Sequence, residues 1–173
     1  ASRIPGIDVK LEEGEAYQLG EYRFESFDIS GHTIGHIAFY CAMEKLCFSG
    51  DTLFAMGCGR MFEGTPRMFH DSLQKIAALP TDTIIYPQHE YTIPNGRFAR
   101  SVEPNNPAIN DHIALAKERR RQGLPSLPTT LERELASNPF LRTDSEEIRS
   151  NLHMSEAEPH EVFGELRRRK DAA

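Results

Sequence analysis

The sequence predicts an α/β fold in which a strand-rich first part precedes a helical second part. Short β-rich segments separated by turn residues occupy the first third of the chain. After about residue 93, apolar residues recur at helical spacing instead. A glycine-rich stretch, GDTLFAMGCGRMFEGT over residues 50–65, lies between these two patterns. We therefore expect the strand-rich part over residues 1–92 and the helical part over residues 93–173.

The strands are expected in five segments. Residues 8–11, 16–20 and 21–29 are rich in β-formers and are split by the turn-forming runs EEGE and GE. Two further segments, HIAFYC and KLCFSG, flank AMEK, which predicts a hairpin. The stretch 50–65 contains several glycines, which weaken helices and strands, so it predicts a shaped loop.

The first helix is expected directly after this loop, because Thr65 is suited to the N-cap and Pro66 to the first helical position. Its predicted buried face is Phe69, Leu73, Ile76 and Ala77. A short buried strand, DTIIYP, follows and ends at Pro87.

The helical part should contain three helices. The first ends at Gly123, the second opens with a capping box from Thr129 to Glu132, and the last opens with a box from Ser155 to Glu158. The expected inward positions are Ile109, Ile113, Leu115 and Ala116 on the first of these helices and Val162, Phe163 and Leu166 on the last.

Composition excludes several classes of protein. The chain has 173 residues, 39% of them hydrophobic, and a net charge of −6, so we expect a globular protein that does not bind nucleic acid. No apolar run approaches the length that spans a membrane. Three cysteines without C-x-x-C spacing favour a reducing compartment, either the cytoplasm or the mitochondrial matrix. No signal peptide is visible at Ala1, and the polar start without methionine suggests that the chain begins within a longer protein.

Three side chains follow predicted strands directly. His32 lies in SGHTIGH, Asp51 in SGDT and His89 in PQHEYT. Residues at the carboxyl ends of strands can converge on one edge of an α/β sheet, where such folds build their sites. Imidazole and carboxylate ligands suit zinc, iron or manganese. The pattern therefore indicates a metal site, although a histidine or aspartate after a strand is more often an ordinary surface, core or turn residue.

The other candidates receive simpler interpretations. His36 is expected at most to orient a ligand through a hydrogen bond. Cys58 is expected to be a small loop residue rather than a nucleophile. The remaining histidines lie on polar helical stretches and are expected to be solvated: His70, His112, His153 and His160.

Several segments together resemble glyoxalase II, the hydroxyacylglutathione hydrolases of the metallo-β-lactamase superfamily. They are GHTIGHIAFY, FSGDTLFAMGCGRMFEGT, HEYT, FARSVEPNNPAI, NPFLR and RRRKD near the end. The resemblance spans most of the chain. It implies the second half of an αββα metallo-β-lactamase sandwich, followed by a helical C-terminal region that binds glutathione.

The resemblance also implies a site with two divalent metal ions, zinc or alternatively iron or manganese. His32 matches a ligand of one ion, His89 matches a ligand of the other, and Asp51 matches the carboxylate that bridges them. In this family the ions share a hydroxide that attacks a thiolester carbonyl. Two neighbouring ions can lower the pKa of a bridging water and stabilise the developing oxyanion.

The same resemblance implies a glutathione thiolester as substrate. The glycine loop would lie against the glutathione moiety, and Arg60 would help to hold it. Tyr91 matches a tyrosine that contacts the substrate, and Phe62 stands where many relatives carry a second one. Arg167 and Lys170 match basic residues that bind the glycine carboxylate, although a basic helix end can also simply stabilise its own dipole.

Two features depart from the family pattern. Gln88 stands where a glycine is common, and the motif T-H-x-H-x-D-H, which precedes these segments in the family, is absent because no histidine precedes His32. Each metal would then keep two ligands of this chain, whereas catalytic sites usually have three or more. We therefore expect that a further N-terminal segment or another chain is needed.

The predicted function is hydrolysis of S-D-lactoylglutathione to D-lactate and glutathione, as in methylglyoxal detoxification. One alternative is a non-catalytic glutathione-binding or interaction module that lacks the metal motif. A second is a mononuclear iron sulfur dioxygenase of the same superfamily, which the long helical tail and GCGRMFEGT fit less well. The metal content of the complete chain distinguishes these three functions: two ions for the hydrolase, none for the binding module and one iron for the dioxygenase.

Overall fold

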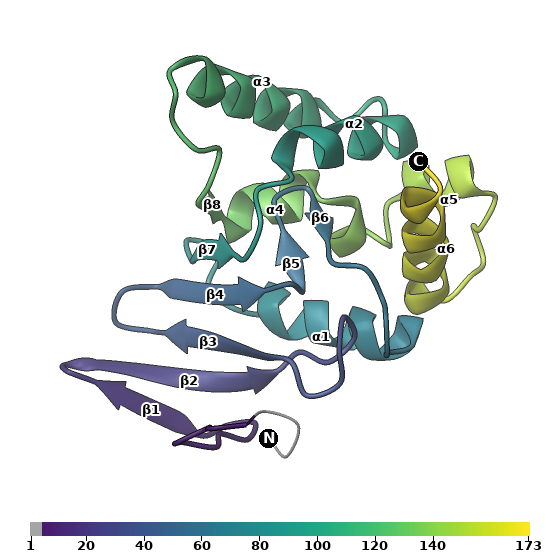
Figure 1. The fold of residues 1–173 in the computed structure, drawn as a ribbon. Coiled ribbons are helices and arrows are strands. Elements are labelled where there is room, and N and C mark those ends of the chain that lie inside the picture. The colour runs from purple at the N-terminus through teal and green to yellow at the C-terminus, as the bar shows by residue number, and fades with distance from the viewer. Residues whose placement is uncertain (1–4) are drawn as a thin grey trace.

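The computed structural model describes residues 5–173 and contains one main sheet with helices packed on one of its faces (Figure 1). The strands lie in the order β1-β2-β3-β4-β7-β8, and β5 and β6 form a separate small hairpin. The strands are β1 Ala16–Leu19, β2 Tyr22–Asp28, β3 Ile37–Cys41, β4 Leu46–Gly50, β5 Leu53–Phe54, β6 Gly57–Cys58, β7 Ile84–Pro87 and β8 Thr129–Thr130. The helices are α1 Pro66–Ala77, α2 Thr92–Val102, α3 Pro107–Arg121, α4 Leu131–Ser137, the short 3-10 helix η1 Pro139–Leu141, α5 Glu146–Leu152 and α6 Pro159–Asp171.

The sheet combines antiparallel and parallel pairs. Strands β1 to β4 form an antiparallel meander, and β7 then pairs parallel to β4 after the chain has passed through α1. Strand β8 comes from the second half of the chain and adds antiparallel to β7, so this half contributes to the sheet as well. The strand expected over residues 8–11 was wrong: this segment forms no strand, and Val9 is exposed, so the segment has no apolar face to bury.

The core lies between the sheet and the helices. Helix α1 begins after Thr65, whose side chain accepts a hydrogen bond from the backbone N–H of Met68, as expected for an N-cap. Its buried side chains join those of the sheet and of α6 in one cluster, which includes Phe69, Leu73, Ile76, Ala38, Cys47, Ile85 and Phe163. Of the face predicted for α1, only Ala77 is half-buried rather than buried.

The other face of the sheet carries apolar side chains that residues 5–173 cover only in part. The ring of Phe48 on β4 contacts Phe24 of β2 and Tyr86 of β7, with ring centroids 6.1 Å and 5.5 Å apart. Tyr17 pairs with Phe24, and Leu19 pairs with Tyr22, so these residues lie on the same side. The exposed fractions of Phe48 and Tyr86 are 40% and 39%, which are high for aromatic side chains in the middle of a sheet. We call the set Tyr17, Leu19, Tyr22, Phe24, Phe48 and Tyr86 the aromatic sheet face.

Both predicted capping boxes were displaced. Helix α4 is capped by Thr130, whose hydroxyl accepts from the N–H of Arg133, because Thr129 is still extended and pairs with Ile85 in the sheet. Helix α6 is capped by Glu158, in a reciprocal box with Glu161. Pro159 explains this shift, since the residue before a proline avoids the helical conformation while proline itself suits the first helical position.

Helix α3 buries three of the four side chains predicted to point inward, namely Ile109, Ile113 and Ala116. Its buried side chains are Ile109, His112, Ile113 and Ala116, which follow the spacing i, i+3, i+4, i+7 of a single helical stripe. Leu115 lies beside this stripe and is 41% exposed. His112 was predicted to be solvated, but its Nδ1 lies 2.9 Å from Ser137 Oγ, and this hydrogen bond satisfies the ring in the interior.

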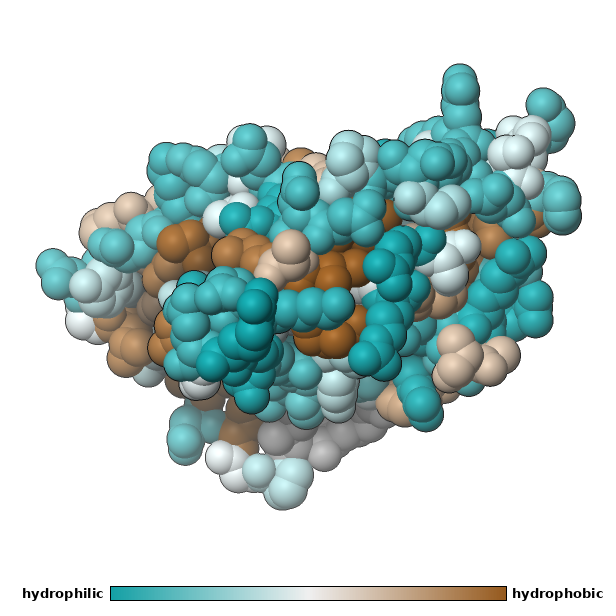
Figure 2. All heavy atoms as spheres, turned by 90° about the horizontal axis from the view of Figure 1, so that it is seen from above, coloured by the Kyte–Doolittle hydropathy of each residue, from teal (hydrophilic) through white to brown (hydrophobic). Residues whose placement is uncertain are grey.

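The surface agrees with the acidic composition. Figure 2 shows hydrophilic residues over most of the face seen from above, with hydrophobic residues visible between and beneath them. Within residues 5–173, no helix combines the length and the apolar character that crossing a membrane requires.

Candidate metal and substrate site

The ends of two neighbouring strands bring Asp51 and His89 together. Gly50, at the end of β4, pairs with Pro87 at the end of β7, so the residues that follow both strands emerge at the same edge of the sheet. His89 Nε2 lies 3.3 Å from Asp51 Oδ1. His32, in the loop after β2, approaches from the other side with Nε2 4.0 Å from Asp51 Oδ2. Each carboxylate oxygen of Asp51 therefore faces the Nε2 atom of one imidazole.

The ring of His32 is held in one orientation. Its Nδ1 lies 2.7 Å from the carbonyl oxygen of Arg60. A carbonyl can only accept a hydrogen bond, so Nδ1 carries a proton, and in the neutral ring the lone pair is on Nε2. This is the arrangement that metal-binding histidines generally show, with the second ring nitrogen bound to a backbone or carboxylate oxygen.

His36 supports the backbone of Asp51. The N–H of Asp51 donates to His36 Nε2 at 3.0 Å, and burial lowers the pKa of His36, which favours the neutral ring that this contact requires. The preceding residue, Gly50, has φ of +52°, and a Cβ there would overlap the His36 ring. His36 was expected at most to orient a ligand through a hydrogen bond, and the hydrogen bond that it makes is to the backbone of Asp51.

The glycine-rich stretch after Asp51 proves to be more ordered than a loop. It turns back on itself as the hairpin of β5 and β6, with Leu53 opposite Cys58. Gly59 then passes so close to Asp51 that a Cβ would overlap the Asp51 carbonyl oxygen and lie 3.1 Å from His32 Nδ1. The glycine is thus needed for close approach to the protein's own backbone, beside the two residues of the predicted metal site.

A pocket of about 550 Å³ opens beside Asp51. It contains every site residue that the sequence predicted, from both halves of the chain: His32, Asp51, Arg60, Phe62, His89, Tyr91, Arg167 and Lys170. The volume falls within the range typical of sites for small molecules.

Aromatic side chains form the walls of this pocket. The ring of Tyr91 stacks on His89 with centroids 5.4 Å apart, and Phe54 packs edge-on against both at 5.6 Å and 6.0 Å. Phe62 lies 5.1 Å from the ring of His32 and is 66% exposed. The pocket therefore has one fixed aromatic wall beside His89 and one more exposed ring beside His32.

The cationic end of the pocket comes from α6 and from Arg60. Arg167 is buried, donating from Nη1 to the Cys58 carbonyl oxygen at 2.9 Å and from Nη2 to Asp171 Oδ1 at 2.9 Å. Its Nε is one of two buried side-chain nitrogen or oxygen atoms without a hydrogen-bond partner in residues 5–173. Burial, followed by the nearby charge of Arg167, lowers the pKa of Lys170, and Arg60 Nε lies 3.8 Å from Asp171 Oδ1.

Cys58 has no role as a nucleophile in this arrangement. Its side chain is buried in β6, and burial raises the pKa of the thiol to about 12, although Arg167 acts in the opposite direction. The thiol is therefore protonated near neutral pH, and a thiol is far less nucleophilic than a thiolate.

Sequence reasoning missed several pocket residues, among them Phe54, Asn95 and Asp171. Phe54 and Asn95 carry no signal of their own, because their positions depend on the hairpin and on the start of α2. Asp171 directly follows the basic run from Arg167 to Lys170, and an acidic residue next to predicted anion-binding cations could have been noticed.

The donor set fits divalent metal ions only in part. Histidine and carboxylate are suitable ligands, and Asp51 offers one oxygen to each side. No group of three or more histidine, cysteine, aspartate or glutamate side chains suited to one ion occurs within the described part of the chain. His32, Asp51 and His89 therefore do not make a complete metal site by themselves.

The comparisons with known proteins identify the class first. The sequence model of the metallo-beta-lactamase superfamily matches residues 1–89, and that of the hydroxyacylglutathione hydrolase C-terminus matches residues 90–173. The fold, with its candidate site at one edge of the sheet, is thus that of a metallo-β-lactamase superfamily protein. Members of this superfamily bind divalent metal ions. Hydroxyacylglutathione hydrolases of Maricaulis maris and Roseobacter denitrificans are 47% and 46% identical to this chain over 98% and 99% of its length. The chain belongs to the hydroxyacylglutathione hydrolase family.

The chain spans about two thirds of these relatives, 66% and 68% of their lengths. Among solved structures, a B3 metallo-β-lactamase named BLEG-1 is 25% identical, with a TM-score of 0.54 over 78% of this chain and 49% of its own. TTHA1623, solved in a di-iron-bound form, is 28% identical, with a TM-score of 0.51 over 79% of this chain and 50% of its own. ETHE1 from Myxococcus xanthus shares the fold, with a TM-score of 0.57 at 21% identity, over 97% of this chain and 62% of its own.

Proposed function

We propose that the protein is a metal-dependent thiolester hydrolase that converts S-D-lactoylglutathione to D-lactate and glutathione. The observation that carries the proposal is the position of Asp51, whose two oxygens each face one imidazole at the edge of a pocket with a cationic end. This arrangement combines a site for a bridged pair of metal ions with a site for an anionic thiol conjugate.

In this proposal His32 and Asp51 hold one ion, and His89 and Asp51 hold the other. Two bound ions of zinc, iron or manganese would supply a hydroxide at neutral pH and a positive charge beside the thiolester oxygen. The Arg60 carbonyl fixes the tautomer of His32, and His36 fixes the backbone of Asp51, so both ligands are oriented in advance.

The remaining pocket residues bind the substrate. Lys170 and Arg167 both line the pocket, and their positive charges suit the glycine carboxylate of glutathione. Tyr91 offers its hydroxyl beside His89, and Arg60 lies at the pocket rim. Phe62 can contribute only an apolar contact. Since the leaving group is a thiolate, the reaction needs little assistance from a general acid.

Two metal ions need more ligands than this chain places at Asp51, so we propose that a further segment or another chain completes the site. About a third of the length of each of these relatives lies outside the part that matches. The buried, free cysteines agree with a reducing compartment such as the cytoplasm or the mitochondrial matrix. No observation favours the non-catalytic alternative or the sulfur dioxygenase.

The test compares Asp51→Ala and the isosteric Asp51→Asn with the parent in the full-length protein. We expect both variants to lose at least one metal ion per chain, measured by elemental analysis, and nearly all hydrolysis of S-D-lactoylglutathione. A variant that retains two metal ions and near-normal turnover would overturn the assignment of Asp51. Absence of hydrolysis in the metal-loaded parent would overturn the proposed substrate.

A further inference from the structure

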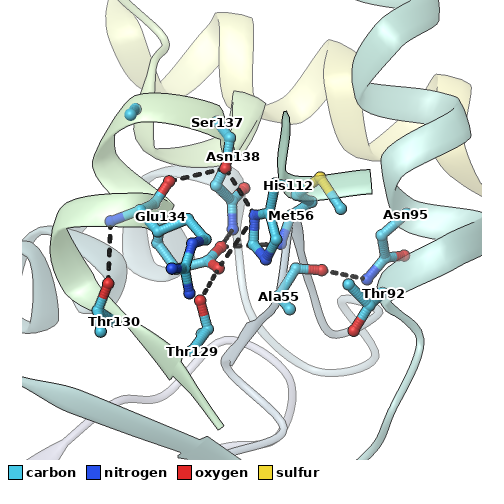
Figure 3. A network of polar contacts seen from close by, with 12 residues as sticks. Ala55, Met56, Thr92, Asn95, His112, Thr129, Thr130, Glu134, Ser137 and Asn138 are labelled. Carbon is cyan, nitrogen blue, oxygen red and sulfur yellow. Dashed lines mark hydrogen bonds and ion pairs between the residues drawn. The ribbon is translucent and has the colours of Figure 1, made fainter. Parts of the chain in front are cut away.

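A buried polar network joins the helical half of the chain to the pocket wall (Figure 3). Its centre is Glu134 of α4, which is fully buried. Glu134 Oε2 accepts from the backbone N–H of Met56 at 2.8 Å and from Asn138 Nδ2 at 3.0 Å, while Oε1 accepts from Thr129 Oγ1 at 2.8 Å. A carboxylate in the interior with three donors is costly to build, and its position points to a purpose beyond packing.

This network satisfies the turn between β5 and β6 almost completely. Asn138 Nδ2 also approaches the carbonyl oxygens of Phe54 at 3.1 Å and Gly57 at 3.0 Å. Asn95 Nδ2 donates to the Ala55 carbonyl oxygen at 3.1 Å, and Met56 donates to Glu134 as described. Three side chains of the second half of the chain thus bind four consecutive residues of the hairpin turn, 54–57.

The turn needs this support because its backbone is unfavourable by itself. Met56 has φ of +52°, a region that residues other than glycine rarely adopt. The hairpin has two pairs of residues in register, too few to be stable alone. A side chain that accepts from the Met56 N–H therefore decides whether the turn keeps its shape.

The 54–57 turn also sets the position of residues that line the pocket. Phe54 begins it and packs against His89 and Tyr91, the two residues proposed to bind a metal ion and the substrate. At the other end, the carbonyl oxygen of Cys58 accepts from Arg167 at the cationic end of the pocket. A displacement of the turn would therefore move both the aromatic wall and the anchor of Arg167.

We infer that Glu134 and Asn138 are positioning residues of the active site, which act through the 54–57 turn on the Phe54–His89–Tyr91 wall. The inference rests on the proposed function for its kinetic consequence only. Neither residue lines the pocket, so neither touches the substrate. Their effect is to keep the wall in the geometry in which His89 faces Asp51 and Tyr91 faces the pocket.

The contact does not require a charge on Glu134. Burial raises the pKa of Glu134 to about 7, so both protonation states are populated near neutral pH. Oε2 can accept from Met56 and Asn138 in either state, while the Thr129 hydroxyl can reverse its direction toward a protonated Oε1. Glu134→Gln offers the same oxygen and should therefore preserve the turn.

The test uses Asn138→Ser in the full-length protein. Serine can keep the hydrogen bond that Asn138 accepts from the Phe140 N–H, but it cannot donate to the turn. We expect the KM for S-D-lactoylglutathione to rise, and the zinc affinity to fall, each on the order of tenfold, the usual scale for one lost buried hydrogen bond. At saturating zinc, kcat should change less than KM.

Ser137→Ala is the matched control, because it removes a buried hydrogen bond at the neighbouring position without touching the turn. It should lower stability while leaving KM and zinc affinity unchanged, and Glu134→Gln should also retain both. If Asn138→Ser does not fold, Glu134→Asp replaces it, since a shorter side chain withdraws the acceptor from Met56. Equal KM and zinc affinity in the tested variant and in Ser137→Ala would overturn the inference. Zinc affinity decides the question even if the protein hydrolyses another substrate.

Discussion

The backbone N–H of Asp51 donates to His36 Nε2 at 3.0 Å, so the residue proposed to bridge two metal ions is held by a histidine that does not line the pocket. This relationship explains why a second histidine follows His32 four residues later in GHTIGH. The first histidine faces Asp51 with its side chain, whereas the second fixes the backbone from which Asp51 extends.

Replacing His36 should therefore weaken metal binding without removing a ligand. We expect His36→Ala to lower zinc affinity by about 10- to 100-fold, the range usual for partners that orient metal ligands. His36→Gln, whose amide oxygen can accept from Asp51, should recover part of the loss. Isothermal titration with zinc in the full-length protein measures both. An affinity equal to that of the parent in His36→Ala would show that Asp51 is oriented by other contacts.

Lys170 provides the cleaner test of substrate binding at α6. Its charge is only partly buried, over the ring of Phe98, whereas Arg167 also holds the Cys58 carbonyl oxygen. Lys170→Ala should raise the KM for S-D-lactoylglutathione about tenfold or more with a smaller change in kcat, as expected for lost ground-state binding. Replacing Arg167 and Lys170 together should raise KM further, but should also lower stability. Steady-state kinetics of the single and double variants decide this point.

An unchanged KM in Lys170→Ala would instead favour a basic helix end that stabilises its own dipole. Arg168→Ala is the matched control for that outcome, because Arg168 pairs with Glu165 on the exposed side of the same helix and does not line the pocket. It should leave KM unchanged under the proposed function.

Much of the fold was predictable because the signals are local. The start of α1 follows from Thr65 and Pro66, and the hairpin of β3 and β4 follows from two β-rich segments around AMEK. The predicted convergence of His32, Asp51 and His89 was also correct. Asp51 and His89 meet because the parallel neighbours β4 and β7 place their following residues at the same edge of the sheet.

Several of the errors share a physical cause, namely contacts between residues distant in sequence. Thr129 is extended because it pairs with Ile85, which displaces the cap of α4 by one residue. His112 is buried because Ser137 supplies a partner, which no pattern within α3 reveals. The hairpin turn at Met56 depends in the same way on Glu134, seventy-eight residues later.

Glu134 and His112 should give the stability of the protein opposing pH dependences. Burial raises the pKa of Glu134 to about 7 from an ordinary value of 4.5, and it lowers the pKa of His112 to about 4 from 6.5. For Glu134 the folded state binds more protons, so its contribution to stability is lost as pH rises from about 4.5 to about 7. For His112 the unfolded state binds more protons, so stability is lost as pH falls from about 6.5 to about 4.

Replacing either Glu134 or His112 with glutamine should remove the pH dependence of stability that this residue contributes. Relative to the parent, the unfolding free energy of Glu134→Gln should rise by up to about 3 kcal/mol between pH 4.5 and 7. That of His112→Gln should rise relative to the parent as the pH falls from 6.5 to 4. Urea denaturation of the metal-free proteins across this range measures both differences. Differences that do not vary with pH would show that neither group changes its protonation on folding.

The aromatic sheet face bears on the proposal that a further segment or chain completes the site. Phe48 and Tyr86 belong to this face and lie on β4 and β7, the two strands that precede Asp51 and His89. A segment that covers this face would therefore end near the incomplete metal site. Exposed apolar surface of this kind drives association when it lacks a partner.

We therefore expect the 173 residues alone to self-associate, and Phe48→Lys to reduce this association by placing a charge on the face. Leu115→Lys on α3 is the control, because Leu115 is about equally exposed, at 41% against 40%, but lies away from the sheet. In the full-length protein we expect the opposite effect of Phe48→Lys: it should lower stability, because the face is then covered. Leu115→Lys should have little effect on stability. Size-exclusion chromatography with light scattering, combined with metal analysis, tests the isolated chain. A soluble monomer of these 173 residues that binds two metal ions tightly would contradict the expectation, because it would need neither a covering segment nor additional ligands.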